Sequence, residues 1–291
     1  MIKKKIGEGK FSEVYLIQED NGKQFVQKEF KSGFIHEARR EYLFLNAIDD
    51  ANVVKAISFN EEEKLNLRLE FIDGIGLDKF QESNLKKIHS IITKLSFSVA
   101  KIHSLGICLN DLKPANIILR NDEPVILDLG LSTLNLYNDK YFRGTVSYAA
   151  PEKILRKTNH EASDVFAIGM ILLKMLNGKI PADDHNVSEY LEIIKNQKKW
   201  NDCLVNFTED SFLKQMLAFD ASERPSALQI AKYFSDLYNF NIGNINEFVV
   251  SNHIFNTHFE AIEQLWRKKI LNYEAYDEID KILQLTSLKN S

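Results

Sequence analysis

The sequence has only two cysteines, Cys108 and Cys203, in 291 residues. Two cysteines are too few for the disulfide framework of a small secreted protein, so we expect a chain that works in the reducing cytoplasm. The first residues, MIKKK, lack the apolar stretch of a secretory signal. We therefore expect no targeting or regulatory segment before the first strand, and delivery into a host cell stays open.

Long hydrophobic runs are also missing. The longest, FAIGMILL at 166–173, is far shorter than the ~20 residues that span a bilayer. A formal net charge of −4 gives no basic surface for nucleic acid or anionic lipid. The remaining composition, 44% hydrophobic and 27% charged residues, is typical of a globular chain with one large or two modest domains.

The first part of the chain, about residues 1–70, has the patterns of strands with one helix. The segments EVYLIQ and KQFVQKEF flank Asn21-Gly22, a strong signal for a tight hairpin. HEARREYLFLNAI has helical spacing, and LNLRLEF alternates apolar and polar residues as a half-buried strand does. The sequence therefore predicts a small β-rich lobe.

Helical patterns begin after the segment IDGIG. SNLKKIHSIITKLSFSVAKIHSLG carries apolar residues at three- and four-residue spacing and ends in glycine. DVFAIGMILLKMLNG is apolar nearly all round, which predicts a helix buried in a core. We expect a short connector near 70–76 and a larger helical lobe up to about residue 240.

The last stretch, 241–291, has a different character. A polar entry is followed by HFEAIEQLWRKKIL, in which an apolar stripe recurs at helical spacing: Phe259, Ile262, Leu265 and Trp266. The stripe predicts a helical extension. It fits a helix that packs on the main body, and it also fits a helix at 255–283 that binds a partner.

The segment IGEGKFSEV at 6–14 places two glycines between two predicted strands. Gly7 and Gly9 would let backbone N–H groups approach a phosphate closely. A two-glycine hairpin turn is an equally simple reading. Ser12 at the third glycine position and the lack of a following βαβ unit argue against a dinucleotide-binding fold.

Lys28 lies within the predicted strand FVQKEF, on the same face as Val26. A lysine in a strand is usually solvated. A carboxylate on the next helix, Glu41 or its rival Glu37, could instead hold the ammonium toward phosphates.

Two further segments carry candidate reacting groups. LNDLKPANIIL at 109–119 sets Asp111, Lys113 and Asn116 between apolar runs, and VILDLGLS ends a predicted strand at Asp128. Asp111 could accept a hydroxyl proton, and Lys113 could offset charge on a phosphoryl group. Asn116 and Asp128 offer oxygen ligands for Mg²⁺.

Taken together and in this order, the motifs resemble those of the protein kinase family over about residues 3–240. The resemblance includes the glycine-rich loop, Lys28, NDLKPAN, DLG and GTVSYAAPE at 144–152. The register of EYLFLNAIDDANVV favours Glu41 over Glu37 as the partner of Lys28. SDVFAIG would supply Asp164 to tie down the catalytic loop, and ERP would supply Arg224 to pair with Glu152.

The resemblance implies an α+β, bilobal kinase fold with a domain at 1–240, and ATP-dependent, Mg²⁺-dependent transfer to Ser/Thr hydroxyls of proteins. The N-lobe would cover about 1–70, the hinge 70–76 and the C-lobe 77–240. Asp111 and Lys113 would be catalytic, and Asn116 and Asp128 would hold the metal. The nucleotide-binding residues would be Ile6, Gly7, Gly9, Val14, Val26, Lys28, Glu41, Leu69, Glu70, Ile72 and Ile118.

The chain departs from the family pattern at several positions, and one of them bears on control. Asn110 replaces the Arg before the catalytic Asp, which in many kinases grips a phosphate on the activation loop. We expect that phosphorylation of Ser132, Thr133, Tyr137 or Tyr141 is not the on-switch, although another cation such as Arg143 or a small-lobe lysine could replace the Arg. A nucleotide-binding pseudokinase scaffold and a small-molecule kinase of related fold remain as alternatives.

Overall fold

The structure is a computed structural model that describes residues 1–62, 64–134, 142, 144–155 and 161–241. The chain divides into two compact units. The first is Met1–Phe80 with Pro114–Ser132, and the second is Gln81–Lys113 with the described residues from Thr133 onward. The helix expected at 255–283 lies outside the described residues.

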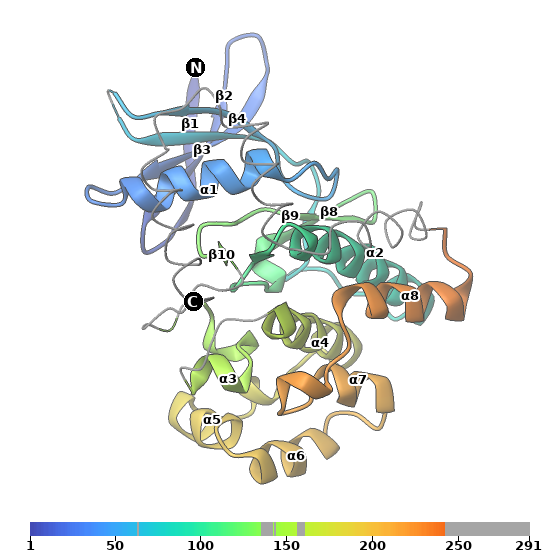
Figure 1. Ribbon diagram of the computed structural model, residues 1–291. Coiled ribbons are helices and arrows are strands. Elements are labelled where there is room, and N and C mark those ends of the chain that lie inside the picture. Colours follow the sequence, from blue (N-terminus) through green and yellow to red (C-terminus); the bar gives the residue numbers. More distant parts are fainter. Residues whose placement is uncertain (63, 135–141, 143, 156–160, 242–291) are drawn as a thin grey trace, which may run out of the picture. The chain divides into compact units, whose positions relative to one another are not determined.

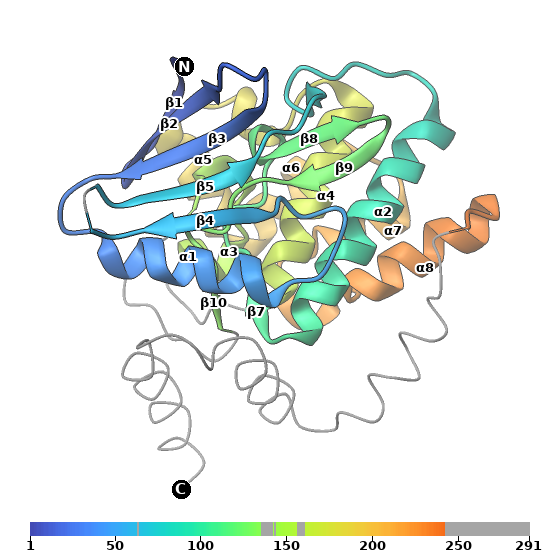
Figure 2. The ribbon, with the colours of Figure 1, turned by 90° about the horizontal axis from the view of Figure 1, so that it is seen from above.

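The first unit contains a five-stranded antiparallel sheet. Its strands are β1 (Ile2–Glu8), β2 (Ser12–Gln18), β3 (Gln24–Phe30), β4 (Ala56–Asn60) and β5 (Asn66–Glu70). They lie in the order β1-β2-β3-β5-β4, and helix α1 (Ile35–Ala47) runs beside β4, as the views in Figure 1 and Figure 2 show.

The expected hairpin forms between β2 and β3, but its loop is longer than a two-residue turn. Gln18 pairs with Gln24, and the Glu19 N–H donates to the Lys23 carbonyl at 2.9 Å, with Gly22 at φ 84°.

The expected alternation of apolar and polar residues in β5 is also confirmed, since Leu67 and Leu69 are buried while Arg68 between them is exposed.

Helix α1 uses its apolar spacing to cover the sheet. Phe44 and Leu45 are buried, and the Tyr42 ring stacks on Phe59 of β4 with 5.1 Å between ring centroids. The same face carries one buried carboxylate, Glu41. A charged group on the packed side of a helix needs a partner, because an unpaired buried charge is costly.

A second, three-stranded sheet belongs to the same unit. It is formed by β6 (Ile75–Gly76), β8 (Ile117–Arg120) and β9 (Glu123–Ile126), in the order β6-β8-β9. Ile126 joins it to the segment after α1, because its N–H donates to Asn52 and its carbonyl accepts from Val54. Pro114–Ser132 therefore groups with the N-terminal residues, although the sequence assigned this stretch to the larger lobe.

The second unit is mainly helical, as expected. Two short strands, β7 (Ile107–Cys108) and β10 (Thr133–Leu134), pair antiparallel. The helices are α2 (Leu85–Ser104), α3 (Pro151–Ile154), α4 (Glu161–Asn177), α5 (Val187–Ile194), α6 (Gln197–Val205), α7 (Ser211–Met216) and α8 (Ala227–Tyr238).

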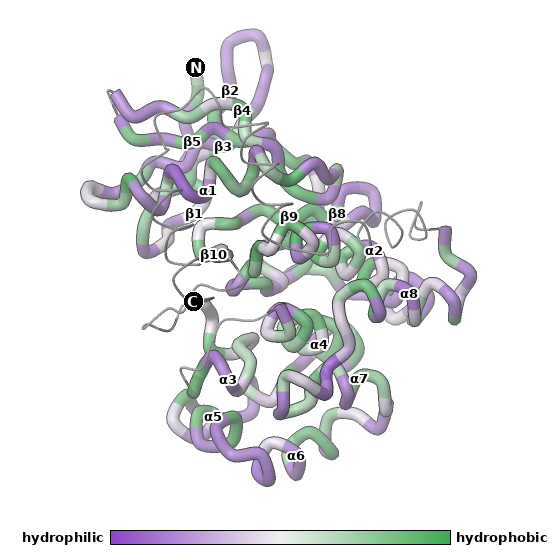
Figure 3. Tube along the Cα trace, viewed as in Figure 1, coloured by the Kyte–Doolittle hydropathy of each residue, from purple (hydrophilic) through white to green (hydrophobic). Residues whose placement is uncertain are grey.

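Two helices of this unit form where the sequence predicted them, although α4 begins at Glu161, three residues before the predicted segment. The Asn84 side chain caps the start of α2, and Gly106 follows its end at φ 71°. Residues 163–173 of α4 are all buried, in keeping with the hydrophobic stretch in Figure 3. None of the helices in the described ranges has the length and apolar character needed to cross a bilayer.

Candidate active site

Lys28 stands at the centre of the sheet of the first unit. It lies on β3 between Val14 of β2 and Leu67 of β5. Its Nζ donates to Glu41 Oε1 at 2.6 Å and to Asp128 Oδ1 at 2.9 Å. The expected pairing with Glu41 rather than Glu37 is thus confirmed, and one ammonium serves two carboxylates.

Burial and charge act in opposite directions on this triad. Burial disfavours the ammonium of Lys28, but Asp128 and Glu41 outweigh it and raise its pKa. Burial raises the pKa of Glu41 to about 7, against the pull of Lys28. Burial would also raise the pKa of Asp128, but Lys28 and the Gly130 N–H lower it. Asp128 is therefore the carboxylate that stays ionised most firmly.

Asn116 and Asp128 lie at the same end of the β8–β9 hairpin. Asn116 ends the short 3₁₀ turn Pro114–Asn116 before β8, and its carbonyl accepts the Leu127 N–H at 3.0 Å. Strand β9 ends at Ile126, two residues before the position that the sequence suggested. The Asp128 side chain is 42% exposed, so one side of the carboxylate is open.

These two side chains fit a magnesium ion that shares its ligands with a nucleotide. Within the described residues, no group of three His, Cys, Asp or Glu side chains could hold a metal by itself. A carboxylate and an amide oxygen are sufficient where phosphate oxygens and water complete the octahedral shell of Mg²⁺.

The glycine-rich loop connects β1 and β2. A Cβ at Gly7 or Gly9 would make only ordinary contacts, 3.6 Å to Val14 Cβ and 3.8 Å to the Ser12 carbonyl oxygen. Neither glycine has positive φ. Within the described protein, neither space nor backbone conformation requires glycine here. Ile6 beside them is 50% exposed.

The other nucleotide-binding candidates lie around the end of β5. Val26 pairs with Leu69 across β3 and β5, and Leu69 is buried. Val14, Val26 and Ile118 are partly exposed. The Glu70 N–H donates to the Lys55 carbonyl at 3.0 Å, and Ile72 is buried. All these candidates belong to the first unit.

The catalytic-loop candidates lie in the second unit, where three side chains form a closed triangle. Lys113 Nζ donates to Asp111 Oδ2 at 2.7 Å and to Thr145 Oγ1 at 2.7 Å. The Thr145 hydroxyl donates to Asp111 Oδ1 at 2.7 Å. Both oxygens of the Asp111 carboxylate are thus held by side-chain donors.

Asp164 holds the residues that precede Asp111. Its carboxylate accepts the N–H groups of Leu109 at 2.7 Å and Asn110 at 2.9 Å. His103 is buried, and its Nε2 lies 3.0 Å from Asp164 Oδ2, in keeping with a core role. The expected anchoring of the catalytic loop by Asp164 is confirmed.

A buried ion pair between Glu152 and Arg224 anchors the APE segment at 150–152. Arg224 Nη1 and Nη2 donate to the two oxygens of Glu152, each at 2.8 Å, so the predicted pair forms and is bidentate. Burial would raise the pKa of Glu152, but Arg224 lowers it on balance. Arg224 also donates to main-chain carbonyls, which leaves its charge well satisfied.

Lys153 also contacts the catalytic loop, and the sequence did not predict it. It is buried on α3, and its Nζ donates to the Asn110 carbonyl at 2.7 Å and to Asn110 Oδ1 at 3.1 Å. Its position just after the APE motif was the only local clue. The two cations considered in place of the missing Arg were Arg143, which lies outside the described residues, and a small-lobe lysine.

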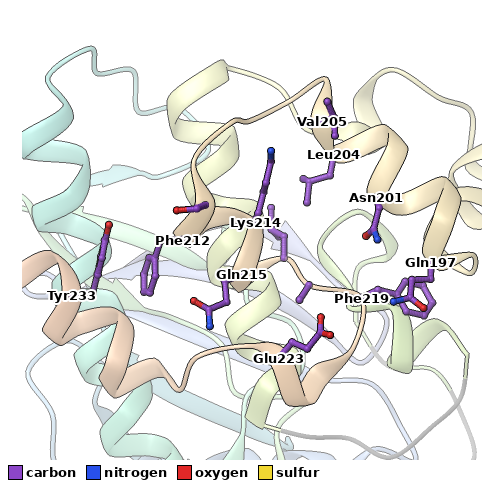
Figure 4. Close-up of a pocket in the computed structure, with 13 residues that line it drawn as sticks. Gln197, Asn201, Leu204, Val205, Phe212, Lys214, Gln215, Phe219, Glu223 and Tyr233 are labelled. Atoms are coloured by element: carbon purple, nitrogen blue, oxygen red, sulfur yellow. The ribbon is translucent and has the colours of Figure 1, made fainter.

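One pocket of about 640 Å³ lies elsewhere, among α6, α7 and α8 (Figure 4). The Phe212 and Tyr233 rings stack at its edge, with 3.8 Å between their centroids. None of the site residues predicted from the sequence lines it.

The structure contains the arrangement that the motifs implied. Lys28 on the sheet pairs with Glu41 and Asp128, and Asp164 of α4 holds the catalytic loop. A model of the protein kinase domain matches residues 1–234, so the chain belongs to the protein kinase family. The predicted α+β kinase fold is thereby confirmed, with an antiparallel sheet and one helix in one unit and a helical second unit.

Individual relatives are more distant. The chain is 28% identical to human ribosomal protein S6 kinase alpha-2 over 213 residues, which are 67% of this chain and 29% of that protein. It is 32% identical over 199 residues to a putative ribosomal protein S6 kinase alpha-1 of Caenorhabditis elegans, covering 61% of this chain and 25% of the relative.

A probable serine/threonine-protein kinase of Dictyostelium discoideum is 28% identical over 259 residues, which are 83% of this chain and 31% of that protein. The chain thus spans about a third of the length of the curated relatives it matches.

Proposed function

We propose that this chain transfers the γ-phosphoryl group of ATP to serine and threonine hydroxyls of protein substrates. The observation that carries the proposal is the triangle of Asp111, Lys113 and Thr145. A substrate hydroxyl at Asp111 can give its proton to the carboxylate while its oxygen bonds to the γ-phosphorus and the bond to ADP breaks. Lys113 can offset charge on the moving group.

The nucleotide would be held by the first unit. Lys28, fixed by Glu41, would contact the α- and β-phosphates, and the backbone at Gly7 and Gly9 would approach them. The lack of any internal need for these two glycines supports this role. The adenine would lie among Ile6, Val14, Val26, Leu69 and Ile118, with its edge at the backbone of Glu70 and Ile72.

Asn116 and Asp128 would hold Mg²⁺. The ion, when bound with ATP, would neutralise phosphate charge and orient the γ-phosphoryl group. Asp128 is suited to this because its carboxylate is ionised, half exposed and anchored on one oxygen by Lys28 and the Gly130 N–H.

Several features support protein hydroxyls as acceptors. Relatives named as ribosomal protein S6 kinases and as a serine/threonine-protein kinase match most of the domain. Lys113 and Thr145 correspond to the serine/threonine branch in the family pattern. The APE segment at 150–152, anchored through Glu152 and Arg224, argues against a small-molecule kinase.

We further propose that phosphorylation of the activation segment is not the on-switch. Two of its candidate acceptors, Ser132 and Thr133, are fully or almost fully buried. Another kinase would reach them only after local unfolding. The other two, Tyr137 and Tyr141, lie outside the described residues.

The domain limits and the cellular location are also proposals. The kinase domain would cover 1–240, with its hinge at 70–76 and lobes at 1–70 and 77–240, followed by a helical extension at 241–291 that could bind a partner through 255–283. Cys108 and Cys203 are free thiols, which supports a reducing cytoplasm. Delivery into a host cell stays compatible with this location.

The test is to offer the full chain ATP labelled in the γ-phosphate with three acceptors, with and without Mg²⁺. The acceptors are a serine/threonine peptide library, a tyrosine-only library and a mixture of small alcohols and amines. We expect Mg²⁺-dependent label on serine and threonine. Nucleotide binding without transfer would identify a pseudokinase scaffold, and label confined to small molecules would identify a small-molecule kinase.

A further inference from the structure

Asn110 links the catalytic loop to the start of the activation segment. Its backbone has φ 68°, a left-handed conformation that Asn adopts more readily than most residues. Its side-chain Nδ2 donates to Thr133 Oγ1 of β10 at 2.9 Å and to the Cys108 carbonyl at 3.3 Å. The side chain thereby ties the residue before Asp111 to β10.

Lys153 approaches Asn110 from α3, 43 residues further along the chain. The residue is only 5% exposed, and Nζ donates to both the main-chain and side-chain carbonyl oxygens of Asn110. Among the described residues, no carboxylate lies within 4.0 Å of this ammonium. Burial lowers the pKa of Lys153, and the charges of Asp164 and Asp111 offset part of that effect.

In the part of the chain that the structure describes, the hydrogen bonds of this buried cation go to neutral carbonyls, which is an expensive arrangement. Moving a charge out of water is costly unless the charge is paired and hydrogen-bonded. An apolar side chain of similar length would fill the same space without that cost. The ammonium therefore contributes something that packing alone does not require.

Gly144 brings the activation segment against the same carbonyl. It has φ 124°, and a Cβ at this position would lie 2.7 Å from the Asn110 carbonyl oxygen and 3.7 Å from Lys153 Nζ. Only glycine fits so close an approach. The next residue, Thr145, donates to Asp111. Lys153, Asn110, Gly144 and Thr145 thus form an unbroken series of contacts that ends at the proposed base.

We propose that Lys153 is a positioning residue for phosphoryl transfer. Its ammonium grips Asn110, so that Asp111 and the 144–145 stretch keep their relative placement without a phosphate. In many kinases an Arg at the position of Asn110 does this only after the activation loop is phosphorylated. Here the cation is built into α3. This inference rests on the proposed kinase function.

The test uses the dephosphorylated full chain and three variants. Lys153→Met removes the charge and keeps the length, whereas Lys153→Arg keeps a cation and donors. Lys174→Met is the matched control, because Lys174 on α4 is partly exposed and pairs with Asp183. For each protein we would measure kcat and KM, Mg·ATP affinity by calorimetry, and hydrogen exchange of peptides covering 105–112 and 144–149.

We expect Lys153→Met to lower kcat at least tenfold and to raise exchange at 144–149 at least tenfold, with Mg·ATP affinity within about twofold of wild type. Lys153→Arg should recover most of kcat, and Lys174→Met should match the wild type. Wild-type kcat and exchange in Lys153→Met would overturn the proposal. The proposal would also be overturned if Lys153→Met lost hydrogen-exchange protection across the whole chain and lost ATP binding as well. Those two losses together would mark a general structural role for Lys153.

Two further outcomes can be distinguished: a Lys153→Met variant that does not fold, and a wild-type chain that transfers no phosphate. If Lys153→Met does not fold, Gly144→Ala displaces the same stretch from Asn110 without changing the buried charge, and it should lower kcat and raise exchange at 144–149. No change in that variant would overturn the proposal. If the wild type transfers no phosphate, the proposed function fails, and the exchange comparison still decides whether Lys153 orders 144–149.

Discussion

At the scale of single residues, the main feature of the first unit is one ammonium shared between two carboxylates. Lys28 donates to Glu41 Oε1 on the buried side and to Asp128 Oδ1 on the open side. Because the pKa of Glu41 is raised to about 7, the three groups carry a net charge between 0 and −1 at neutral pH, and the exposed carboxylate among them is Asp128. A divalent cation is the natural complement of such a carboxylate.

Asp128→Asn should therefore abolish the Mg²⁺ dependence of nucleotide binding while leaving the fold intact, because the amide still accepts from Lys28. We expect the affinity for Mg·ATP to fall at least tenfold by calorimetry. Bound at 100 times its Kd, a ligand stabilises a protein by ~2.7 kcal/mol, so the thermal shift with Mg·ATP should also largely disappear.

The matched control for this prediction is Asp236→Asn on the exposed side of α8. It should bind Mg·ATP as the wild type does. An Asp128→Asn variant with the wild-type affinity in the presence of Mg²⁺ would rule out the metal role of Asp128.

Glu152 and Arg224 provide a prediction about stability and pH. The pKa of Glu152 is lowered from its ordinary value of 4.5. A carboxyl with a lowered pKa stabilises the fold fully above its unfolded pKa, and the contribution disappears as the pH falls through the folded pKa. Breaking a buried pair leaves the partner charge unsatisfied and costs ~3–5 kcal/mol.

Glu152→Gln should accordingly lower the free energy of unfolding by about 3 kcal/mol at pH 7. The difference from wild type should be constant between pH 6 and 8 and narrow as the pH falls below about 4.5. Urea unfolding at each pH measures it, with the exposed Glu209→Gln as control. A difference that grows on acidification would contradict this assignment.

At the scale of elements, the activation segment contacts Asn110 through Thr133 of β10 and returns to the catalytic loop at Gly144 and Thr145. These contacts are made in the unphosphorylated protein. A hydrogen bond to a charged group contributes ~1.5–3 kcal/mol, which is enough to move a loop from mostly disordered to mostly ordered. Lys153 makes two such bonds to Asn110.

Phosphatase treatment should therefore leave the activity unchanged. Asn110→Arg, which restores the common family residue, should not activate the enzyme. It would place a guanidinium beside the Lys153 ammonium, which lies 3.1 Å from Asn110 Oδ1, and so should lower stability. A loss of tenfold or more in activity on dephosphorylation, ~1.4 kcal/mol, would show that a phosphate does act as the switch.

The sequence could predict an element where neighbouring residues determine it, and it could not predict a contact that depends on residues far away in the chain. The alternation in β5 and the periodicity of α2 and α4 are local, so the predicted elements formed where expected. Lys28 and Glu41 could be paired because ordered motifs fixed their register. Apart from its position just after the APE motif, Lys153 gave no local sign of its burial, because the burial depends on a contact with Asn110, which is distant in sequence.

At the scale of the whole molecule, each of the two units carries a different part of the proposed function. All nucleotide and metal candidates lie in the first unit, and Asp111, Lys113 and Thr145 lie in the second. The boundary at Lys113–Pro114 passes through the motif NDLKPAN itself. The sequence could not predict this grouping, because it arises when Ile126 pairs with Asn52 and Val54, far away in the chain.

A chain shortened to residues 1–241 should fold and act as the full chain does. The last described helix, α8, buries Ile230, Ala231 and Phe234 and packs beside α2, so the core of the second unit includes residues close to the proposed end of the domain. We expect kcat within threefold of the full chain and the same thermal shift with Mg·ATP. An insoluble or inactive product would mean that the proposed domain does not end near residue 240.

In the proposed function, Asp111 is the base of a phosphoryl transfer. The most direct measurement is single-turnover transfer from Mg·ATP to a serine/threonine peptide by wild type and by Asp111→Asn, with ATP affinity measured in parallel. A positioned general base contributes ~10²–10⁴-fold. We predict a loss of that size in Asp111→Asn with ATP affinity unchanged. Transfer at the wild-type rate in Asp111→Asn would contradict the account.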